Sequence, residues 1–423
     1  MLGSTFLHLL PLVSIASAAA ICLDARQSNS NDNSTSSSSS SSGMDSFNTS
    51  APVGPYSLSN ADCTNLTLSI PVNLTLSNFT DVDNYSSNQS YITKQILELA
   101  VAPTNWTSAH ASGNTSFNLN KTFSIAGYYC TPKQGLRNDS ALWNLVHGIG
   151  FDASYWDFAL APEYSLVKHA ASYGISTFRY NRLGTGKSET PTNGFDVVRA
   201  QTEVAILEGV LEKLRNGTEV GGKKHDKIVG IGHSYGSVQT QAVSKDRPEL
   251  LDAVVLTSYT TNTTNLPGYL EAASYSIARN IFPNCLGDKP PTWLVTGSNA
   301  SNIMGFFYPP YYLQAAFDLS RATEQVVTLG AFATISAVGG EATNFTGPVH
   351  VVNGAKDYIF CSSNCWAKGQ DGKLIPESMQ MLYLQTKNFS SYIAKDTGHA
   401  ITPHYSQPMI AEEIVSWVMD QGL

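Results

Sequence analysis

Charged side chains are scarce in this chain of 423 residues. Lys, Arg, Asp and Glu together make up 14% of the sequence, against about 25% in a typical soluble domain. The 33 acidic and 25 basic side chains give a formal net charge of −8, and no long run of Lys and Arg is present. The chain therefore has neither the basic surface of a nucleic-acid-binding protein nor a polybasic membrane anchor. We set both function classes aside.

Long apolar runs are also missing after the first twenty residues. No later run reaches the roughly 18 apolar residues of a membrane span, so we expect no stable membrane anchor. Residues 1–20 are apolar and end in small residues, with Ala16-Ser17-Ala18 resembling a cleavage site. A membrane anchor is the alternative interpretation, but Pro11 and the small-residue end favour a cleaved signal peptide. The sequence therefore predicts a secreted, extracellular protein.

Cysteine is infrequent, with six residues in all. Cys361 and Cys365 are separated by three residues, an unusual spacing for zinc, and no second pair matches it. In a secreted chain an even number of cysteines favours disulfides over metal binding. We expect Cys63 to pair with Cys130 and Cys361 with Cys365, although sequence alone does not fix the connectivity.

Serine and asparagine are abundant, in contrast to charge. Residues 21–60 contain a Ser/Asn-rich tract, with serine at every position from Ser36 to Ser42, and are predicted to form a flexible low-complexity linker. Sixteen N-x-S/T sequons occur, ten of them between Asn33 and Asn120. In a secreted protein these are acceptors for glycans. The glycosylation candidates are Asn65, Asn73, Asn78, Asn105, Asn114, Asn216, Asn262 and Asn344.

The folded domain is expected over residues 61–423 and begins with a strand pattern. Apolar and polar residues alternate from Leu66 to Ser77, which predicts a half-buried strand with Asn65 and Asn73 on its wet face. Pro71 within this run places it at a sheet edge. A return strand ending at Cys130 completes a predicted N-terminal strand extension over residues 61–135.

From residue 141 the pattern changes to strands alternating with helices. Short apolar runs are spaced along the rest of the chain, and amphipathic stretches lie between them; the runs are 142–146, 175–180, 227–231, 253–257 and 349–352. Such alternation predicts an α/β fold, with a mostly parallel central sheet covered by helices on both faces. Residues 260–345 interrupt it and are predicted to be an inserted cap. Their aromatic cluster Phe306–Tyr312 fits a cap core and a substrate wall equally well.

One motif carries the chemistry. Gly232-His-Ser234-Tyr-Gly236 follows a predicted strand and precedes a helical pattern, as in a nucleophile elbow. The N–H groups of Ile149, in the earlier segment His147-Gly-Ile-Gly150, and of Tyr235 are candidates for an oxyanion hole. Asp357 and His399 follow later strands, which gives the chain order Ser…Asp…His.

These motifs resemble the α/β-hydrolase superfamily over about residues 120–423. His147-Gly-Ile-Gly150, Arg182-Leu-Gly-Thr-Gly-Lys-Ser188, Gly232–Gly236 and Gly398-His399 match in order and spacing. A secreted fungal branch of serine hydrolases, esterase-like, is most similar and also carries sequences like Tyr128–Pro132 and Tyr155–Phe158. The resemblance implies an α/β-hydrolase fold with an inserted cap. Asn181 departs from the Asp that is common before the Arg, a position that usually supports the fold beneath the elbow.

Other residues compete for these roles. Asp396 is nearer in sequence to His399 than Asp357 is, but three residues before the histidine we expect it to cap the turn. His404 is expected to pack at the start of the last helix. Asp152 and Asp157 are expected to orient backbone, and His233 to pack behind the elbow.

The sequence thus predicts a secreted serine hydrolase that cleaves a carboxylic ester through an acyl-enzyme, with Ser234, His399 and Asp357 as its triad. The alternative is a tailoring hydrolase of a natural-product ester, thioester or lactone in secondary metabolism. A peptidase or a non-catalytic glycosylated binding protein is less favoured. No metal or organic cofactor is implied. The expected partner is a small-molecule ester-type substrate, and the oligomeric state is left open.

Overall fold

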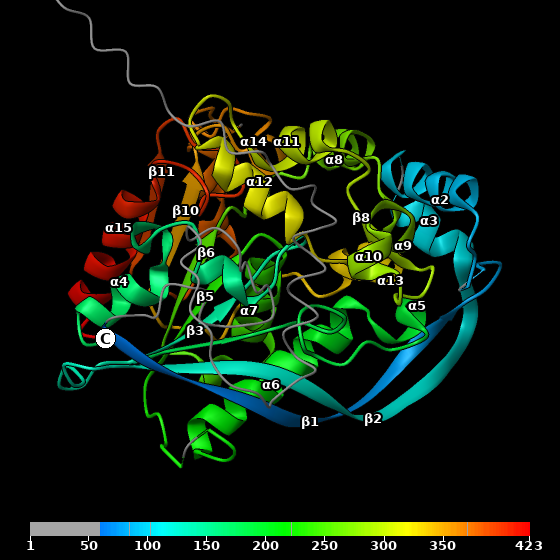
Figure 1. Cartoon of the computed structure of the whole chain (residues 1–423). Helices are drawn as coiled ribbons and strands as arrows, with labels where there is room; N and C mark the ends of the chain where they lie inside the picture. Colours follow the sequence, from blue (N-terminus) through cyan, green and yellow to red (C-terminus); the bar gives the residue numbers. More distant parts are fainter. Residues whose placement is uncertain (1–59, 84, 102, 221, 370) are drawn as a thin grey trace, which may run out of the picture.

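The computed structural model describes residues 60–423, apart from residues 84, 102, 221 and 370. The expected signal peptide and almost all of the expected linker lie outside the described residues. Eight strands form one sheet in the order β1-β2-β4-β3-β5-β6-β10-β11, and a three-stranded sheet β7-β8-β9 lies apart from it. Figure 1 shows the large sheet with helices packed around it.

Six neighbouring strands of the large sheet are parallel. They are β3 (Leu142–Val146), β4 (Thr177–Tyr180), β5 (Ile228–His233), β6 (Ala253–Thr257), β10 (Val349–Gly354) and β11 (Phe389–Ala394). In the first five of these, every residue is buried. This explains their continuous apolar runs in the sequence, because both faces of a parallel sheet are covered. The α/β fold predicted from the sequence is confirmed.

Two pairs of helices cover the sheet. α4 (Leu166–Ser172) packs with α15 (Gln407–Asp420), and α6 (Ala200–Asn216) packs with α7 (Tyr235–Asp246). Val204, Leu207 and Leu211, at helical spacing, lie on the buried face of α6. Short elements join these layers: α5 (Gly194–Val197), α14 (Tyr358–Cys361), and the 3-10 helices η1 (Ala153–Trp156), η2 (Pro162–Tyr164), η3 (Pro248–Leu250), η4 (Ile335–Ala337) and η5 (Ile375–Leu382).

The N-terminal part is a long antiparallel ribbon of β1 (Ala61–Phe79) and β2 (Ala111–Pro132). β2 joins the sheet only through Gly127–Cys130, which pairs with β4. Alternate residues of β1 are buried, so the period of two in the sequence is the period of burial. The exposed Pro71 lies on this edge strand, as its sequence predicts.

Between these two strands the chain forms two helices that were not predicted from the sequence, although Ile92, Ile96 and Leu99 of the first follow helical spacing. α2 (Gln89–Val101) and α3 (Pro103–His110) lie at the far end of the ribbon in Figure 1, beside the cap. α2 contacts α8 (Leu266–Ala273), and α3 contacts α13 (Leu329–Thr334). The ribbon therefore reaches past the sheet and packs its helical end against the segment expected to form the cap.

That segment, between β6 and β10, is mostly helical and holds the small sheet. Its other elements are β7 (Ser276–Ile277), α9 (Ala278–Ile281), α10 (Pro283–Leu286), β8 (Trp293–Val295), α11 (Asn299–Phe306), α12 (Gln314–Ala322) and β9 (Val327–Thr328). α8 and α11 both contact α14, the short helix that follows β10. The cap segment is thus packed against the loop that follows a central strand.

Disulfides join Cys63 to Cys130 and Cys361 to Cys365, the two pairs expected from the sequence. The first links directly paired positions of β1 and β2, and the second lies within the loop after β10. Cys285 is disulfide-bonded as well. A membrane span would require a longer and more apolar helix than any in the described part of the chain.

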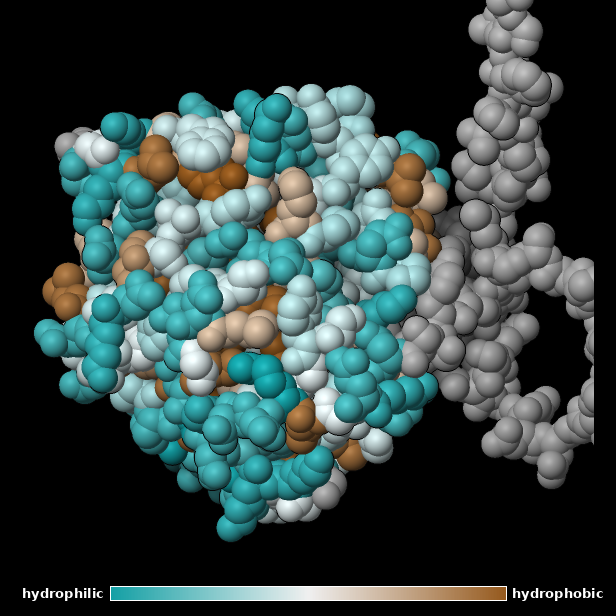
Figure 2. Space-filling view, turned by 90° about the vertical axis from the view of Figure 1, so that its left-hand side faces the viewer, coloured by the Kyte–Doolittle hydropathy of each residue, from teal (hydrophilic) through white to brown (hydrophobic). Residues whose placement is uncertain are grey.

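The surface is polar although charge is scarce. Figure 2 shows the side on which α4 and α15 lie, and hydrophilic residues cover most of it, interrupted by small hydrophobic patches. The low content of charged residues therefore does not leave this face apolar.

Candidate active site

Ser234 lies at a sharp turn between β5 and α7. Its backbone has φ 52° and ψ −117°, an unfavourable conformation for a residue with a Cβ atom. A Cβ on Gly232 would lie 2.5 Å from the Gly236 carbonyl oxygen, and one on Gly236 would collide with the Val146 carbonyl. Both glycines are therefore needed for the close approach of strand, turn and helix. Ser234 is partly exposed, whereas the residues on either side of it are buried.

The turn places the Ser234 hydroxyl beside His399. Ser234 Oγ lies 2.8 Å from His399 Nε2, and His399 Nδ1 lies 2.9 Å from Asp357 Oδ2. The three residues come from different loops, 165 and 42 positions apart in the sequence. The structure thus brings together the three residues that the sequence singled out.

Burial and hydrogen bonding indicate which nitrogen of His399 carries the proton. The side chains of His399 and Asp357 are fully buried. The other carboxylate oxygen of Asp357, Oδ1, accepts hydrogen bonds from the N–H groups of Ile359 and Phe360 at 2.9 and 3.0 Å. Because an ionised carboxylate only accepts hydrogen bonds, His399 Nδ1 carries the proton and Nε2 is free to accept from the Ser234 hydroxyl. This is the tautomer that a general base requires.

The His399 ring is enclosed by aromatic side chains. The rings of Phe306 and Phe360 lie 6.0 and 5.9 Å from it, and that of His233 lies at 5.3 Å. The Ser258 hydroxyl donates a 2.7 Å hydrogen bond to the His399 carbonyl, which anchors the backbone. Burial lowers the pKa of His233 well below its ordinary value, so the neighbouring ring is neutral.

His233 packs behind the elbow, where the sequence predicts it. Its ring stacks on Tyr155 at a centroid distance of 4.3 Å, and its Nδ1 lies 3.1 Å from Thr257 Oγ1. Phe151 and Trp156 line the same region. This aromatic packing supports the turn from below.

The N–H groups of Ile149 and Tyr235 are the expected oxyanion donors. Tyr235 is the first residue of α7, so its N–H has no partner within the helix. Among the hydrogen bonds of the described residues, neither N–H donates to another protein group. The positive end of the α7 dipole adds to the attraction for a negatively charged oxygen.

A buried ion pair, whose role the sequence did not reveal, supports this side of the site. Arg182 Nη1 lies 3.0 and 3.2 Å from the two carboxylate oxygens of Glu203, and its Nη2 donates to the Gly148 carbonyl at 3.3 Å. The guanidinium also covers the Tyr235 ring at 4.8 Å. Arg182 therefore contacts both segments that carry the candidate oxyanion donors.

His147 completes this network as a neutral ring. Its Nδ1 lies 2.9 Å from the Gly148 carbonyl, and its Nε2 accepts from the Arg182 N–H at 3.1 Å. Burial, and secondly the charge of Arg182, lower the pKa of His147 well below its ordinary value. The motif residues His147 and Arg182 thus fix the loop around Ile149 without needing a charge on the histidine.

The two competing residues differ in outcome. The Asp396 carboxylate forms no hydrogen bond to its turn among the described residues and lies 3.7 Å from Lys395 Nζ, so the expected cap is wrong. His404 is buried just before α15, as predicted, and its carbonyl accepts from the N–H of Gln407, the first residue of that helix, at 3.0 Å. Its Nε2 accepts from the N–H groups of Tyr308 and Gly398. Burial lowers the pKa of His404 to about 4, which keeps it an acceptor.

The two aspartates near the oxyanion loop differ from each other. Asp152 Oδ1 accepts from the Ser154 N–H at 2.9 Å and so orients backbone, as predicted. Asp157 does not orient backbone as predicted. Its carboxylate binds Arg179 at 2.7 Å and accepts a hydrogen bond from the Ser165 hydroxyl. Among the described residues, the Asp157 carboxylate therefore interacts with the side chains of Arg179 and Ser165 and not with backbone N–H groups.

Asn181 stands where the superfamily commonly has Asp. Its Oδ1 accepts from the Ala153 N–H at 2.9 Å, and its Nδ2 donates to the Tyr128 hydroxyl at 3.1 Å. An ionised Asp could accept the first hydrogen bond but could not donate the second. The amide therefore joins the loop after β3 to β2.

The rings of the aromatic cluster Phe306–Tyr312 have different neighbours. The Phe306 ring lies 6.0 Å from the His399 ring, whereas Phe307 packs against Phe317 and His404. Tyr308 and Tyr311 stack on each other near the surface, with centroids 5.5 Å apart. Within the described residues, no cluster of three or more His, Cys, Asp or Glu side chains could hold a metal ion.

The sequence also matches a known family. Residues 145–411, more than half of the chain, match the model of the Alpha/beta hydrolase family. The chain belongs to this family, which confirms the resemblance seen in its motifs. No curated protein matches the chain.

Solved structures resemble the chain at low identity. A thermophilic esterase from Thermogutta terrifontis is 15% identical, with a TM-score of 0.48 over 71% of this chain and 94% of its own. A monoacylglycerol lipase from Paleococcus ferrophilus is 17% identical, with a TM-score of 0.45 over 71% and 99%. A putative lipase from Acinetobacter baumannii AYE is 15% identical, with a TM-score of 0.46 over 81% and 99%. At these values we draw no conclusion about substrate from them.

Proposed function

We propose that this protein is a secreted serine hydrolase that cleaves a carboxylic ester. The observation that carries the proposal is the hydrogen-bonded series from Ser234 Oγ to His399 Nε2 and from His399 Nδ1 to Asp357, at 2.8 and 2.9 Å. A serine hydroxyl, a neutral imidazole and a buried carboxylate in this order form an activated nucleophile. Membership of the Alpha/beta hydrolase family supports the same chemistry.

In the proposed mechanism, Ser234 Oγ attacks the ester carbonyl carbon while His399 Nε2 takes its proton. Asp357 holds the imidazole and stabilises the imidazolium that forms. The N–H groups of Ile149 and Tyr235 donate to the oxyanion of the tetrahedral intermediate. His399 then gives its proton to the leaving alcohol, and an acyl-Ser234 ester remains. A water molecule, activated by His399, attacks this ester and releases the acid.

The rings around His399 favour a small ester with an apolar part. Phe151, Phe306 and Phe360 are buried beside the triad, and such walls stabilise apolar acyl or alcohol groups. A tailoring hydrolase acting on a natural-product ester, thioester or lactone fits the same walls and is the second candidate. Secretion is supported by the apolar first twenty residues, the sequons and the disulfides. Motifs similar to those of secreted fungal hydrolases agree with it.

The test is covalent labelling together with hydrolysis. Wild-type protein should react with a fluorophosphonate probe and hydrolyse p-nitrophenyl esters, and Ser234→Ala should lose both, with kcat falling on the order of 10⁴–10⁶-fold. Ser237→Ala is the matched control, because the Ser237 hydroxyl bonds to the Thr257 carbonyl instead of His399. Hydrolysis by Ser234→Ala at the wild-type rate would overturn the proposal, and a binding protein would show no adduct in either form.

Two further measurements separate the alternatives. Peptide substrates and lactones tested beside acyl esters of increasing chain length distinguish a peptidase or lactonase from an esterase. Production in a secreting host followed by N-terminal sequencing tests the compartment. The mature chain should begin within a few residues of Ala18, and retention of Met1 in the medium fraction would contradict a cleaved signal peptide.

A further inference from the structure

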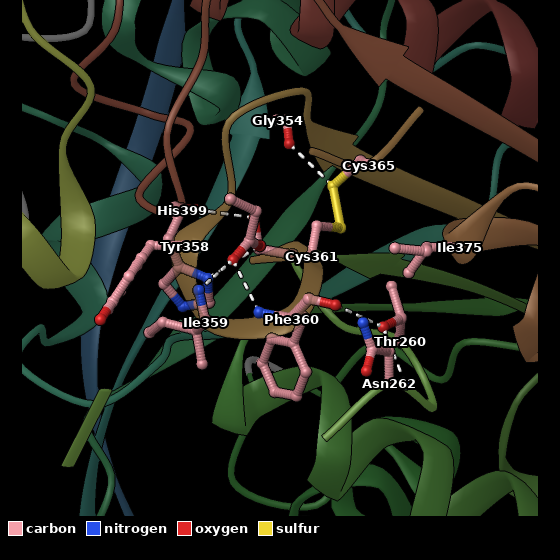
Figure 3. The surroundings of a disulfide bond; sticks show 12 residues. Thr260, Asn262, Gly354, Tyr358, Ile359, Phe360, Cys361, Cys365, Ile375 and His399 are labelled. Atoms are coloured by element: carbon pink, nitrogen blue, oxygen red, sulfur yellow. Dashed lines mark hydrogen bonds and ion pairs between the residues drawn. A yellow bond between two sulfur atoms is a disulfide. The ribbon is translucent and has the colours of Figure 1, made fainter. Parts of the chain in front are cut away.

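The Cys361–Cys365 disulfide closes a five-residue ring directly after Asp357 (Figure 3). Both cysteines are buried, at 1% and 0% exposure. The ring contains Cys361, the last residue of α14, and the four loop residues after it, and Asp357 is the N-cap of α14. The only covalent crosslink in this loop therefore starts four residues from the candidate catalytic carboxylate.

The ring holds a backbone that is unfavourable by itself. Ser362 and Ser363 are consecutive residues with φ of 48° and 63°, in the left-handed region that normally favours glycine. Side chains with a Cβ keep such a conformation only where the surroundings enforce it. The disulfide spans both serines and supplies a covalent constraint.

The same loop provides the donors to Asp357 Oδ1 and to the Asp357 carbonyl, whereas Oδ2 accepts from His399. The N–H groups of Ile359 and Phe360 donate to Oδ1 at 2.9 and 3.0 Å. The N–H groups of Cys361 and Ser363 donate to the Asp357 carbonyl at 3.2 and 2.9 Å. A cysteine and a left-handed serine thus fix the backbone from which the carboxylate extends.

The far end of the ring is fastened to the central sheet. The Cys365 N–H donates to the Ala355 carbonyl at 3.0 Å, and Cys365 Sγ lies 3.0 Å from the carbonyl oxygen of Gly354, the last residue of β10. The disulfide consequently ties α14 back to the strand from which Asp357 leaves.

We infer that the Cys361–Cys365 disulfide is a positioning device for the active site, which holds the α14 turn so that Asp357 aims Oδ2 at His399 Nδ1. This inference rests on the proposed function. Hydrolysis should then depend on the oxidised state of this one disulfide. Its reduction to two thiols would remove the covalent constraint that keeps Ser362 and Ser363 in the left-handed conformation. The N–H groups that donate to Oδ1 would then no longer be held in place. Cys63–Cys130, which links β1 to β2 outside the site, has no such role.

The test compares the two disulfides in the full chain. In Cys361→Ser/Cys365→Ser, kcat per fluorophosphonate-titrated site should fall on the order of 10–100-fold, with KM nearly unchanged, since a small misplacement of a catalytic group has an effect of this size. Cys63→Ser/Cys130→Ser is the control and should lower Tm while leaving kcat per site within about twofold. A native kcat per site in the first variant would overturn the inference.

Glycine provides a rescue that a general loss of stability would not show. Adding Ser362→Gly and Ser363→Gly to the disulfide-free variant relieves the left-handed strain, and kcat should recover at least about threefold. The same glycines in the wild-type chain should leave kcat unchanged. A kcat that falls in proportion to Tm in both disulfide variants, without recovery by glycine, would overturn the inference.

A measurement on the wild-type chain covers the case in which the serine variant does not fold. The native enzyme is treated with tris(2-carboxyethyl)phosphine below its unfolding transition, and acid quenching with mass spectrometry identifies which pair is reduced. Hydrolysis should decline with the reduced fraction of Cys361–Cys365, and full activity of molecules with this pair reduced would overturn the inference. Wild-type protein that hydrolyses no ester and takes up no probe would instead contradict the proposed function.

Discussion

The parallel part of the sheet and the N-terminal ribbon differ in how they use their side chains. In β3, β5 and β10 every residue is buried, and the loops at their ends carry the oxyanion segment, Ser234 and Asp357. In β1 burial alternates, and one face of the strand is open to solvent. The ribbon contributes packing for α6 and a disulfide, and none of the residues around His399 lies on it.

A single substitution should have a larger effect at the end of a parallel strand than on the ribbon. A group at the end of a parallel strand is buried among partners, so its loss leaves other polar groups or charges unpaired. A side chain on the wet face of the ribbon has water as its alternative partner. Substitutions in the two regions should therefore differ in their effect on activity and stability.

Asp357→Asn should lower kcat about 10⁴-fold, because an amide cannot stabilise the imidazolium and favours the wrong tautomer. The control is Asp396→Asn, at the nearby aspartate whose carboxylate lies 3.7 Å from Lys395 Nζ. It should keep kcat within about twofold. Steady-state hydrolysis of a p-nitrophenyl ester measures both, and equal losses in the two variants would refute the assignment of Asp357.

Arg182→Met should lower the free energy of unfolding by about 3–5 kcal/mol, because Glu203 would remain as an uncompensated buried charge. It should also reduce kcat, since Arg182 holds the Gly148 carbonyl and covers the Tyr235 ring. Urea unfolding and ester hydrolysis are the measurements.

The ribbon offers a matched ion pair at the surface. Lys121 and Glu189 lie 2.5 Å apart with side chains 42% and 27% exposed, and pairs of this kind contribute at most about 1 kcal/mol. Lys121→Met should therefore change the unfolding free energy by no more than this amount. An equal effect of Arg182→Met and Lys121→Met would remove the contrast between the two regions.

The raised pKa of Asp152 should make the stability of the folded protein depend on pH. Burial raises its pKa to about 6 in the folded protein, from about 3.9 in an unfolded chain. The folded state therefore binds the proton more tightly, and stability from this group is lost as the pH rises from about 4 to 6. Asp152→Asn removes this loss, so its unfolding free energy relative to wild type should rise by about 1–3 kcal/mol between pH 3.5 and pH 7. A pH-independent difference in urea unfolding would show that folding does not raise the pKa of Asp152.

Asn73→Gln on the exposed face of β1 should have the smallest effect. The unfolding free energy of unglycosylated protein should change by less than about 0.5 kcal/mol, with kcat unchanged. In a secreting host the substitution should remove the mass of one N-linked glycan, as measured by intact mass spectrometry. An unchanged mass would mean that this sequon carries no sugar.

Much of the fold could be predicted from local sequence. Full burial of β3 and β5 requires uninterrupted apolar residues, and one-sided burial of β1 requires alternation, so the two kinds of strand were distinguishable. α2 was not predicted, although Ile92, Ile96 and Leu99 follow helical spacing. α3 has only eight residues, and its stability depends on contacts with α13. The ring partners of His404 could not be predicted for a related reason: Tyr308 and Gly398 lie in different loops, and no periodicity places a side chain between them.

The sequence by itself determined the elbow, the chain order of Ser234, Asp357 and His399, and the low charge. The first two follow from local rules: glycines permit a tight turn, and parallel strands end at the same edge of a sheet. The two disulfide pairs were expected from the sequence, but the structure decided the connectivity. Only the tertiary structure decided that Arg182 reaches Glu203 and Gly148, that Phe306 covers His399, and that a disulfide restrains the turn after Asp357. Those contacts depend on distances between segments far apart in the chain, which packing alone sets.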